Sequence, residues 1–253
     1  MLPLTDSALA RQLAARAGDE LLILRDKLGF GDAKALRHEG DQRAHAVLMS
    51  ALAESRPDDA ILSEEGKGEQ GRDGAARLDA SRVWIVDPLD GTREYGEEGR
   101  DDWAVHVALW ENGDLTAGAV ALPAQDTVLG ADEPPKVPRH DRRIQIACSR
   151  TRPPEFLPRL ADAIGADLVP MGSAGAKASA VITGRVDAYV HAGGQYEWDS
   201  AAPVAVARAA GLHTSRIDGA PLTYNNPDPK LSDLVVCRDD LAALILKGIA
   251  AVR

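Results

Sequence analysis

The sequence predicts a layered α/β protein in which helices cover sheets, built from two halves. Apolar residues recur at helical spacing over residues 7–28, and fully apolar runs such as 83–86 have the character of strands buried on both faces. Helices and strands then alternate in the second half. Because residues 131–143 are rich in proline and charge, we expect an α+β half over 1–138 and an α/β half over 139–253.

Composition limits the kind of partner that this protein can bind. The chain has 253 residues, of which 45% are hydrophobic, and a formal net charge of −10. An acidic chain does not offer a basic groove for a nucleic-acid polymer. No apolar run approaches the roughly 20 residues of a membrane helix, and the first residues lack the pattern of a signal peptide. We therefore expect a cytoplasmic protein that has no nucleic-acid or membrane partner and binds anions only where cations reverse the local sign.

The first half is predicted to contain two helices and several strands. The helix over residues 7–28 is expected to stop at Gly29, and a second helix to open near Asp41. Asn112-Gly113 is a strong signal for a two-residue hairpin turn. The predicted strands, in chain order, are 60–62, 83–86, 103–110 and 115–122.

The second half is predicted to alternate strands with helices. Gly184 and Gly211 each follow an apolar helical pattern and are typical helix stops. The final helix of this series is rich in alanine. The predicted strands are 143–148, 167–171 and 186–190, and the predicted helices are 154–164, 175–183 and 199–210.

The most informative stretch is WIVDPLDGT, residues 84–92, in which an apolar strand runs into two aspartates. The proline after Asp87 is expected to end the strand, and a helix can begin after Asp90. Both carboxylates can then face one point, which suits a hard cation such as magnesium, and the backbone N–H groups that follow can meet an anion. The alternative is that one aspartate caps a helix and the other makes a turn.

Other carboxylates also stand at the ends of apolar elements. Glu64 and Glu65 follow a short strand, and Asp199 and Asp41 each lie at a predicted helix start. Taken singly, each has an ordinary interpretation, either a solvated loop or a helix cap. Four such positions in one chain favour a single acidic site.

These motifs, in this order, resemble the magnesium-dependent, lithium-sensitive phosphatase superfamily of inositol monophosphatases, fructose bisphosphatases and bisphosphate nucleotidases. The resemblance covers nearly the whole chain and implies the αβαβα layered sandwich of sugar phosphatases. Finer features are similar to the 3'(2'),5'-bisphosphate nucleotidase branch of the CysQ type, and one of them to its actinobacterial members. These features are Arg93-Glu94, GSAGAK at 172–177, Glu197 before WDSAAP, PLTYNN at 221–226 and GRDDWAVHVALW at 99–110.

The resemblance implies roles for the acidic residues and for their neighbours. It implies two or three magnesium ions and a metal-activated water as the nucleophile. Thr92, oriented by Asp41, takes the proton of that water, and Glu65 keeps the site in shape. The implied metal ligands are Glu64, Asp87 and the Leu89 carbonyl for one ion, and Asp87, Asp90 and Asp199 for a second.

The expected substrate is a small phosphate ester that carries two phosphates. Lys177 and Arg93 are candidates for the second phosphate, and Gly172 permits close backbone approach. The residues predicted to contact substrate are Gly91, Thr92, Arg93, Gly172, Ser173, Lys177, Glu197 and Asp199. The expected reaction is removal of the 3'-phosphate from 3'-phosphoadenosine 5'-phosphate, with 3'-phosphoadenylyl sulfate as a further candidate, in sulfate assimilation.

Three alternatives remain open from the sequence. Within the same class, the protein is an inositol monophosphatase or a fructose-1,6-bisphosphatase. From another class, it is a metal- and nucleotide-binding sensor without turnover. A homodimer is expected only by analogy with the superfamily.

Overall fold

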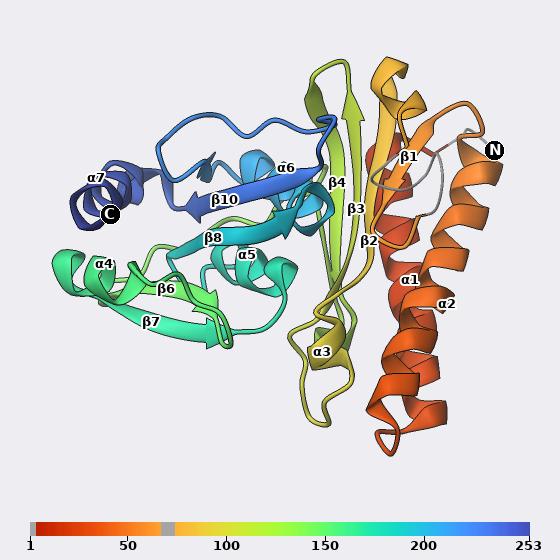
Figure 1. The fold of residues 1–253 in the computed structure, drawn as a ribbon, viewed down its shortest axis with the longest axis horizontal. Helices are drawn as coiled ribbons and strands as arrows, with labels where there is room; N and C mark the ends of the chain where they lie inside the picture. The colour runs from red at the N-terminus through yellow and green to blue at the C-terminus, as the bar shows by residue number, and fades with distance from the viewer. Residues whose placement is uncertain (1–3, 67–73) are drawn as a thin grey trace.

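The computed structural model describes residues 4–66 and 74–253, which form five alternating layers of helices and sheets (Figure 1). Helices α1 (Asp6–Leu28) and α2 (Ala33–Ser55) make the first layer. The second layer is a five-stranded sheet with neighbours in the order β1-β2-β3-β4-β5. Its strands are β1 (Ala60–Ser63), β2 (Arg82–Asp90), β3 (Ala104–Glu111), β4 (Asp114–Leu122) and β5 (Thr127–Gly130).

The other three layers come from the second half of the chain. Helices α5 (Ala174–Ile182) and α6 (Ala201–Ala209) lie between the two sheets. The second sheet has the order β7-β6-β8-β10-β9, and α4 (Leu157–Ile164) and α7 (Ala242–Val252) cover its outer face. Its strands are β6 (Ile144–Ser149), β7 (Ala166–Met171), β8 (Ala188–Tyr196), β9 (His213–Ser215) and β10 (Lys230–Cys237). The predicted layered fold is therefore confirmed.

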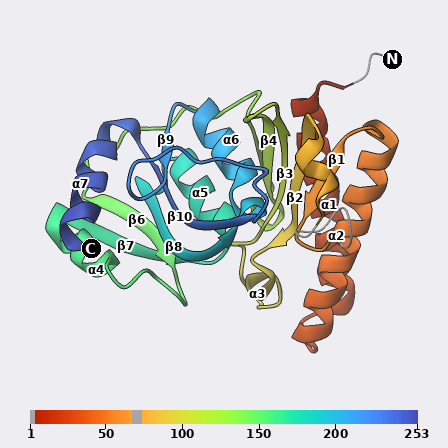
Figure 2. The same cartoon turned by 45° about the horizontal axis from the view of Figure 1, so that its top comes forward.

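Alternation along β2 explains why its sequence is apolar without a break. Trp84 and Val86 pack among residues of α1 and α2, whereas Val83 and Ile85 pack in the core that contains α5 and α6. Successive side chains of a strand point to opposite faces, so a sheet covered on both faces needs apolar residues at every position. Figure 2 shows the same sandwich from a second angle, with the α1/α2 pair and the α4/α7 pair at its two ends.

Most predicted elements are present with small shifts at their ends, and the hairpin is confirmed. Asn112 and Gly113 both have positive φ, 48° and 104°, as a tight hairpin between β3 and β4 requires. The short helical segments are η2 (Ala76–Asp79), α3 (Thr92–Tyr95), η3 (Pro123–Gln125), η4 (Glu197–Asp199) and η5 (Asp239–Leu241).

Two local predictions were wrong. Helix α2 begins at Ala33, where the Asp32 side chain accepts hydrogen bonds from the N–H groups of Lys34 and Ala35, so Asp41 lies inside the helix and caps nothing. Strand β2 continues past Pro88 to Asp90, which pairs with Ala104. The register of β2 and β3 shifts between Asp87 and Asp90, and a proline is tolerated where the ladder is interrupted in this way.

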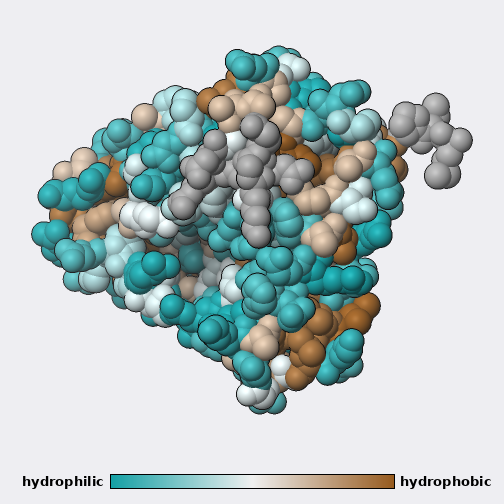
Figure 3. Space-filling view, turned by 45° about the vertical axis from the view of Figure 1, so that its right-hand side comes forward, coloured by the Kyte–Doolittle hydropathy of each residue, from teal (hydrophilic) through white to brown (hydrophobic). Residues whose placement is uncertain are grey.

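The predicted boundary between residues 138 and 139 falls between the two sheets. Because α5 and α6 pack against the first sheet, the two halves share one core, and their independence as domains stays a prediction. No helix of the described chain is both long and apolar enough to cross a membrane. Figure 3, which turns the α1/α2 side forward, shows a largely hydrophilic surface on which apolar side chains gather near the lower right. Ile23 and Leu28 of α1 are exposed.

Candidate active site

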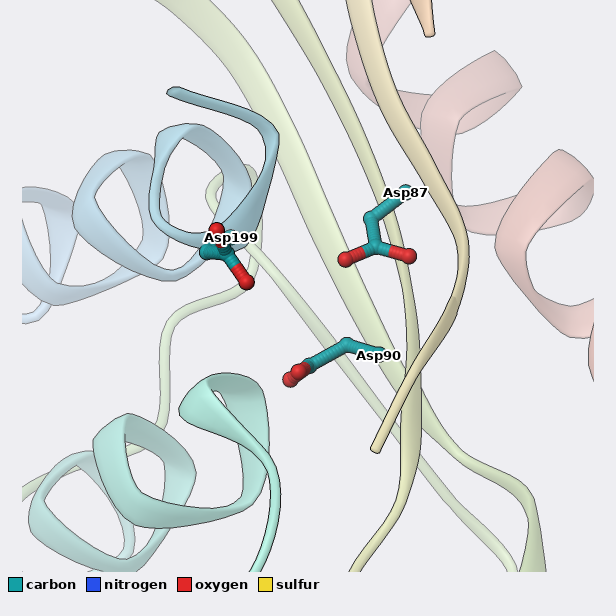
Figure 4. A group of neighbouring side chains, drawn as sticks. All are labelled: Asp87, Asp90 and Asp199. Atoms are coloured by element: carbon teal, nitrogen blue, oxygen red, sulfur yellow. The ribbon is translucent and has the colours of Figure 1, made fainter. Parts of the chain in front are cut away.

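Three aspartates from distant parts of the chain converge at the junction of the two halves. Asp87 and Asp90 come from β2, and Asp199 ends the η4 turn just before α6. One carboxylate oxygen from each lies within 4.8 Å of the others, and Figure 4 shows the β2 pair pointing toward Asp199. Asp87 and Asp90 are buried and Asp199 is half-buried. The structure thus brings together three of the predicted metal ligands.

The irregular end of β2 directs its two carboxylates to the same side. The N–H of Leu89 donates to Asp87 Oδ1 at 3.0 Å, which closes a tight turn around the proline. Gly91 then has φ 82°, and a Cβ at this position would lie 2.9 Å from Cβ of Ser173. Glycine is needed at position 91 for both reasons.

Asp90 also joins the two halves through the first turn of α5. The N–H groups of Ala174 and Gly175 donate to its carboxylate at 3.1 and 2.6 Å, and the Ser173 hydroxyl donates a short third bond. Free N–H groups at a helix start favour a negative charge. The start of α5 therefore meets the negative charge of Asp90.

Among the residues that the structure describes, no arginine or lysine forms an ion pair with the three aspartates of the cluster. Burial, together with the neighbouring Asp90 and Glu64, raises the pKa of Asp199 to about 8. Burial and three neighbouring carboxylates raise the pKa of Asp87 well above its ordinary value. Glu64 is exposed overall, but its carboxyl group hydrogen-bonds to that of Asp87. Burial of this carboxyl group raises the pKa of Glu64 to about 7. Oxygen ligands that repel one another in this way fit a hard divalent cation.

Thr92 and Asp41 stand beside the cluster as an interacting pair. The Thr92 hydroxyl lies 3.1 Å from the Leu89 carbonyl oxygen and also hydrogen-bonds to the Asp41 carboxyl group. Burial, followed by the nearby Glu65 and Glu64, raises the pKa of Asp41 to about 7. Glu65 is half-buried and accepts a long bond of 3.4 Å from the Gln42 amide. The middle of α2, not its start, therefore supplies Asp41 to the site.

A cleft of about 260 Å³ opens from the cluster between the two halves. Asp90, Thr92 and Asp199 line the end of the cleft that contains the cluster. Cationic side chains and the exposed glycines of β8 line the rest. The lining residues that the sequence had predicted as substrate contacts are Gly91, Thr92, Arg93, Gly172, Ser173, Lys177 and Asp199.

Comparison with known proteins now identifies the family. The sequence profile of the Inositol monophosphatase family matches residues 7–250. The protein belongs to the inositol monophosphatase family. The resemblance predicted from the acidic motifs is thereby confirmed.

Individual relatives refine this assignment. A protein of Mycobacterium leprae named 3'-phosphoadenosine 5'-phosphate phosphatase is 49% identical over 96% of this chain and 93% of its own length. A Mycobacterium bovis protein of the same name is 51% identical over 92% and 89% of the two chains. The crystal structure of CysQ from Bacteroides thetaiotaomicron superposes with a TM-score of 0.79 at 25% identity, covering 92% of this chain and 97% of the other.

Two cationic side chains at the cleft of this family member are already engaged by the protein. The Lys177 ammonium is buried and donates to the carbonyl oxygens of Gly172, at 2.9 Å, and of Ser173. Burial lowers its pKa. Arg150 forms ion pairs of 2.6 Å with both Glu94 and Glu97.

Two other cleft cations are available to a ligand. Arg93 and Arg152 pair with no carboxylate in the part of the chain that the structure describes. Arg150 and Arg152 were not predicted from the sequence as cleft residues. Their signal is the stretch CSRTRPP at 148–154, which places two arginines directly after strand β6.

Glu197 lies outside the cleft, in contrast to its predicted substrate contact. Its carboxylate is fully buried and accepts bonds from the N–H groups of Asn225 and Asn226, at 2.7 and 2.9 Å, and from the Asn226 amide at 2.7 Å. Arg77 of η2 holds the same loop through a 2.5 Å bond to the Asn225 side chain. With both oxygens engaged, Glu197 anchors the turn that carries Asp199.

Proposed function

We propose that the protein is a metal-dependent phosphatase that removes the 3'-phosphate from 3'-phosphoadenosine 5'-phosphate. The observation that carries the proposal is the convergence of Asp87, Asp90 and Asp199 beside the Thr92–Asp41 pair at the end of an open cleft. The name shared by the two mycobacterial relatives favours this substrate over an inositol or fructose phosphate.

The cation that fits the cluster is magnesium, and we propose at least two ions. The first would be held by Glu64, Asp87 and the Leu89 carbonyl, and the second by Asp87, Asp90 and Asp199. Bound divalent cations supply Lewis-acid stabilisation of the negative charge that develops on the oxygens around phosphorus. The raised pKa values of Asp199 and Glu64 support the assignment, because a nearby cation would favour the anionic forms of both carboxyl groups, which burial disfavours.

The Thr92–Asp41 pair provides a path for the proton of the attacking water. When its own hydrogen is donated to Asp41, the Thr92 oxygen is free to accept a proton. Asp41 has a pKa of about 7, raised first by burial, so its carboxylate can accept the proton from Thr92 near neutral pH. Glu65 contributes by keeping this pKa raised.

A second phosphate on the substrate explains the unpaired cations at the cleft. Arg93 follows Thr92 directly, and Arg152 lies in the opposite half, so a ligand in the cleft lies between two guanidinium groups. Guanidinium groups bind phosphate through paired N–H donors. Lys177 acts instead by fixing the backbone of Gly172 and Ser173 against the ligand.

A phosphate-release assay tests the proposal. The purified protein with magnesium is supplied in turn with 3'-phosphoadenosine 5'-phosphate, 3'-phosphoadenylyl sulfate, inositol 1-phosphate and fructose 1,6-bisphosphate, with and without lithium. We expect the highest kcat/KM with the bisphosphate nucleotide and inhibition by lithium. Faster release from inositol or fructose esters, or nucleotide binding without any release, would contradict the proposal.

A further inference from the structure

His106 is a buried titratable residue to which the proposed chemistry gives no role, and it lies against Asp90, opposite Asp87 in the sheet and beside the peptide that precedes Asp199. It belongs to β3, where it is the cross-strand partner of Asp87. Its side chain is fully buried, and its ring fills the space between the first sheet and helices α5 and α6.

One edge of the ring holds the segment that carries Asp199. Nδ1 of His106 lies 3.0 Å from the carbonyl oxygen of Trp198, the residue directly before Asp199. Because a carbonyl oxygen only accepts, the imidazole is the donor in this bond. A residue of the first half therefore fixes the peptide that positions the metal ligand from the second half.

The other edge of the ring lies against Asp90. Nε2 of His106 lies 3.3 Å from Asp90 Oδ2, within the distance of an ion pair, but it has no aligned hydrogen bond with any described residue. The ring also packs on Gly175, where a Cβ would lie only 2.0 Å from Nε2. The N–H of Gly175 donates to the same Asp90 oxygen at 2.6 Å. The imidazole thus bounds the space in which that carboxylate can move.

We propose that His106 is a positioning residue that sets the geometry of the metal ligands across the two halves. It touches Asp90, neighbours Asp87 in the sheet and holds the peptide before Asp199, so its removal loosens all three at once. Groups that orient metal ligands from behind contribute to affinity although they never touch the ion. The inference rests on the metal-dependent function proposed above.

The test compares magnesium binding by substrate-free variants, measured by calorimetry, with thermal stability. His106→Phe keeps a ring of similar size and removes both polar contacts. His106→Asn retains a donor near the position of Nδ1, and His106→Gln retains a polar group near the position of Nε2. Leu109→Ala is the matched control, because Leu109 is fully buried in the same strand but faces α1 and α2.

We expect His106→Phe to weaken magnesium binding about tenfold, as loss of a ligand-orienting group does, with Asn and Gln intermediate. Leu109→Ala should lower Tm and leave magnesium affinity unchanged. Equal affinity in wild type and His106→Phe, or an equal loss in Leu109→Ala, would overturn the inference and leave the proposed function intact. If His106→Phe does not fold, wild-type affinity in both His106→Asn and His106→Gln would overturn it. A wild-type protein that binds no magnesium would contradict the proposed function and this inference together.

Discussion

Two groups of carboxylates near the cleft differ in how their charge is balanced. In the cluster, burial and mutual repulsion raise the pKa values of Asp87 and Asp199, and no arginine or lysine forms an ion pair with either in the described structure. At the mouth of the cleft, Arg150 forms ion pairs with Glu94 and Glu97. Asp102 is likewise paired, since it accepts bonds from Arg100 and from the N–H of Gly172.

The difference in charge balance distinguishes carboxylates that hold the fold together from carboxylates that are suited to binding a cation. The paired carboxylates tie the first half to the second, because Arg150 and Gly172 lie across the cleft from Glu94 and Asp102. The unpaired carboxylates destabilise the protein until a cation arrives, since a buried charge without a partner is costly.

Replacing one carboxylate from each group should have opposite effects on stability. Asp87→Asn removes a repelling charge, so we expect the metal-free protein to keep or raise its Tm at about pH 8. Activity should fall roughly a thousandfold, because a lost ligand costs several kcal/mol of transition-state stabilisation. Asp102→Asn should lower Tm by leaving Arg100 without its partner. Thermal melts and phosphate release measure both effects, and a lower Tm for Asp87→Asn would remove the distinction between the groups.

A rise in pH should lower the thermal stability of the metal-free protein and raise its affinity for magnesium. Burial raises the pKa of Asp41 and Glu64 to about 7 and that of Asp199 to about 8, above the values of the unfolded chain. The contribution of these carboxyl groups to the free energy of unfolding of the metal-free protein is therefore complete below about pH 4 and is lost as the pH rises through about 7 to 8.

We accordingly expect the metal-free Tm to fall between about pH 4 and pH 8 and to level off at higher pH. Magnesium affinity should rise roughly a hundredfold between about pH 6 and pH 8, because the ion competes with protons for the same oxygens. Calorimetry and melting curves over this range provide the check. A pH-independent magnesium affinity would mean that these carboxylates are not the ligands.

The unpaired cations of the cleft should discriminate between one and two phosphates. Arg93→Gln and Arg152→Gln are each expected to lower kcat/KM for 3'-phosphoadenosine 5'-phosphate roughly ten- to a hundredfold, the worth of a hydrogen bond between charged groups. Adenosine 3'-monophosphate should be affected little. Arg150→Gln is the paired control and should lower Tm while affecting both substrates alike. An equal loss on both substrates for Arg152→Gln would exclude it from binding the second phosphate.

The smallest effect is expected at Glu65. Its negative charge helps to raise the pKa of Asp41, after burial. Glu65→Gln should therefore move the acid limb of the pH–rate profile to lower pH and change the maximal rate little. A large loss of kcat at every pH would assign Glu65 a direct part in the reaction.

Much of this site could be predicted from local sequence because its motifs are compact. DPLDGT, EE and WDSAAP each place their carboxylates at the end of an apolar element, and the structure brings Asp87, Asp90 and Asp199 together. The fold could also be predicted, since the spacing of apolar residues distinguishes strands from helices and indicates which faces of them are buried.

What escaped prediction depends on contacts between distant residues. Asp41 resembles a helix cap in sequence, but Asp32 provides the true cap nine positions earlier. Lys177 has the chemistry of a phosphate ligand, yet burial directs its ammonium group to two backbone carbonyls. Glu197 was predicted to contact the substrate but is buried, whereas Arg152 was not predicted and lines the cleft. The reason is the same, because only the tertiary arrangement decides which charged group already has a partner.

The proposed metal site requires that acidic side chains from both halves of the chain converge on divalent cations. Crystals grown with manganese in place of magnesium test it directly, because anomalous scattering locates that ion without reference to the protein. The account predicts anomalous peaks among the carboxylates of Asp87, Asp90 and Asp199, with Glu64 on one of the ions. The proposed metal site would be contradicted if crystals at about pH 8 with saturating manganese kept the carboxylates in these positions but showed no anomalous peak between them.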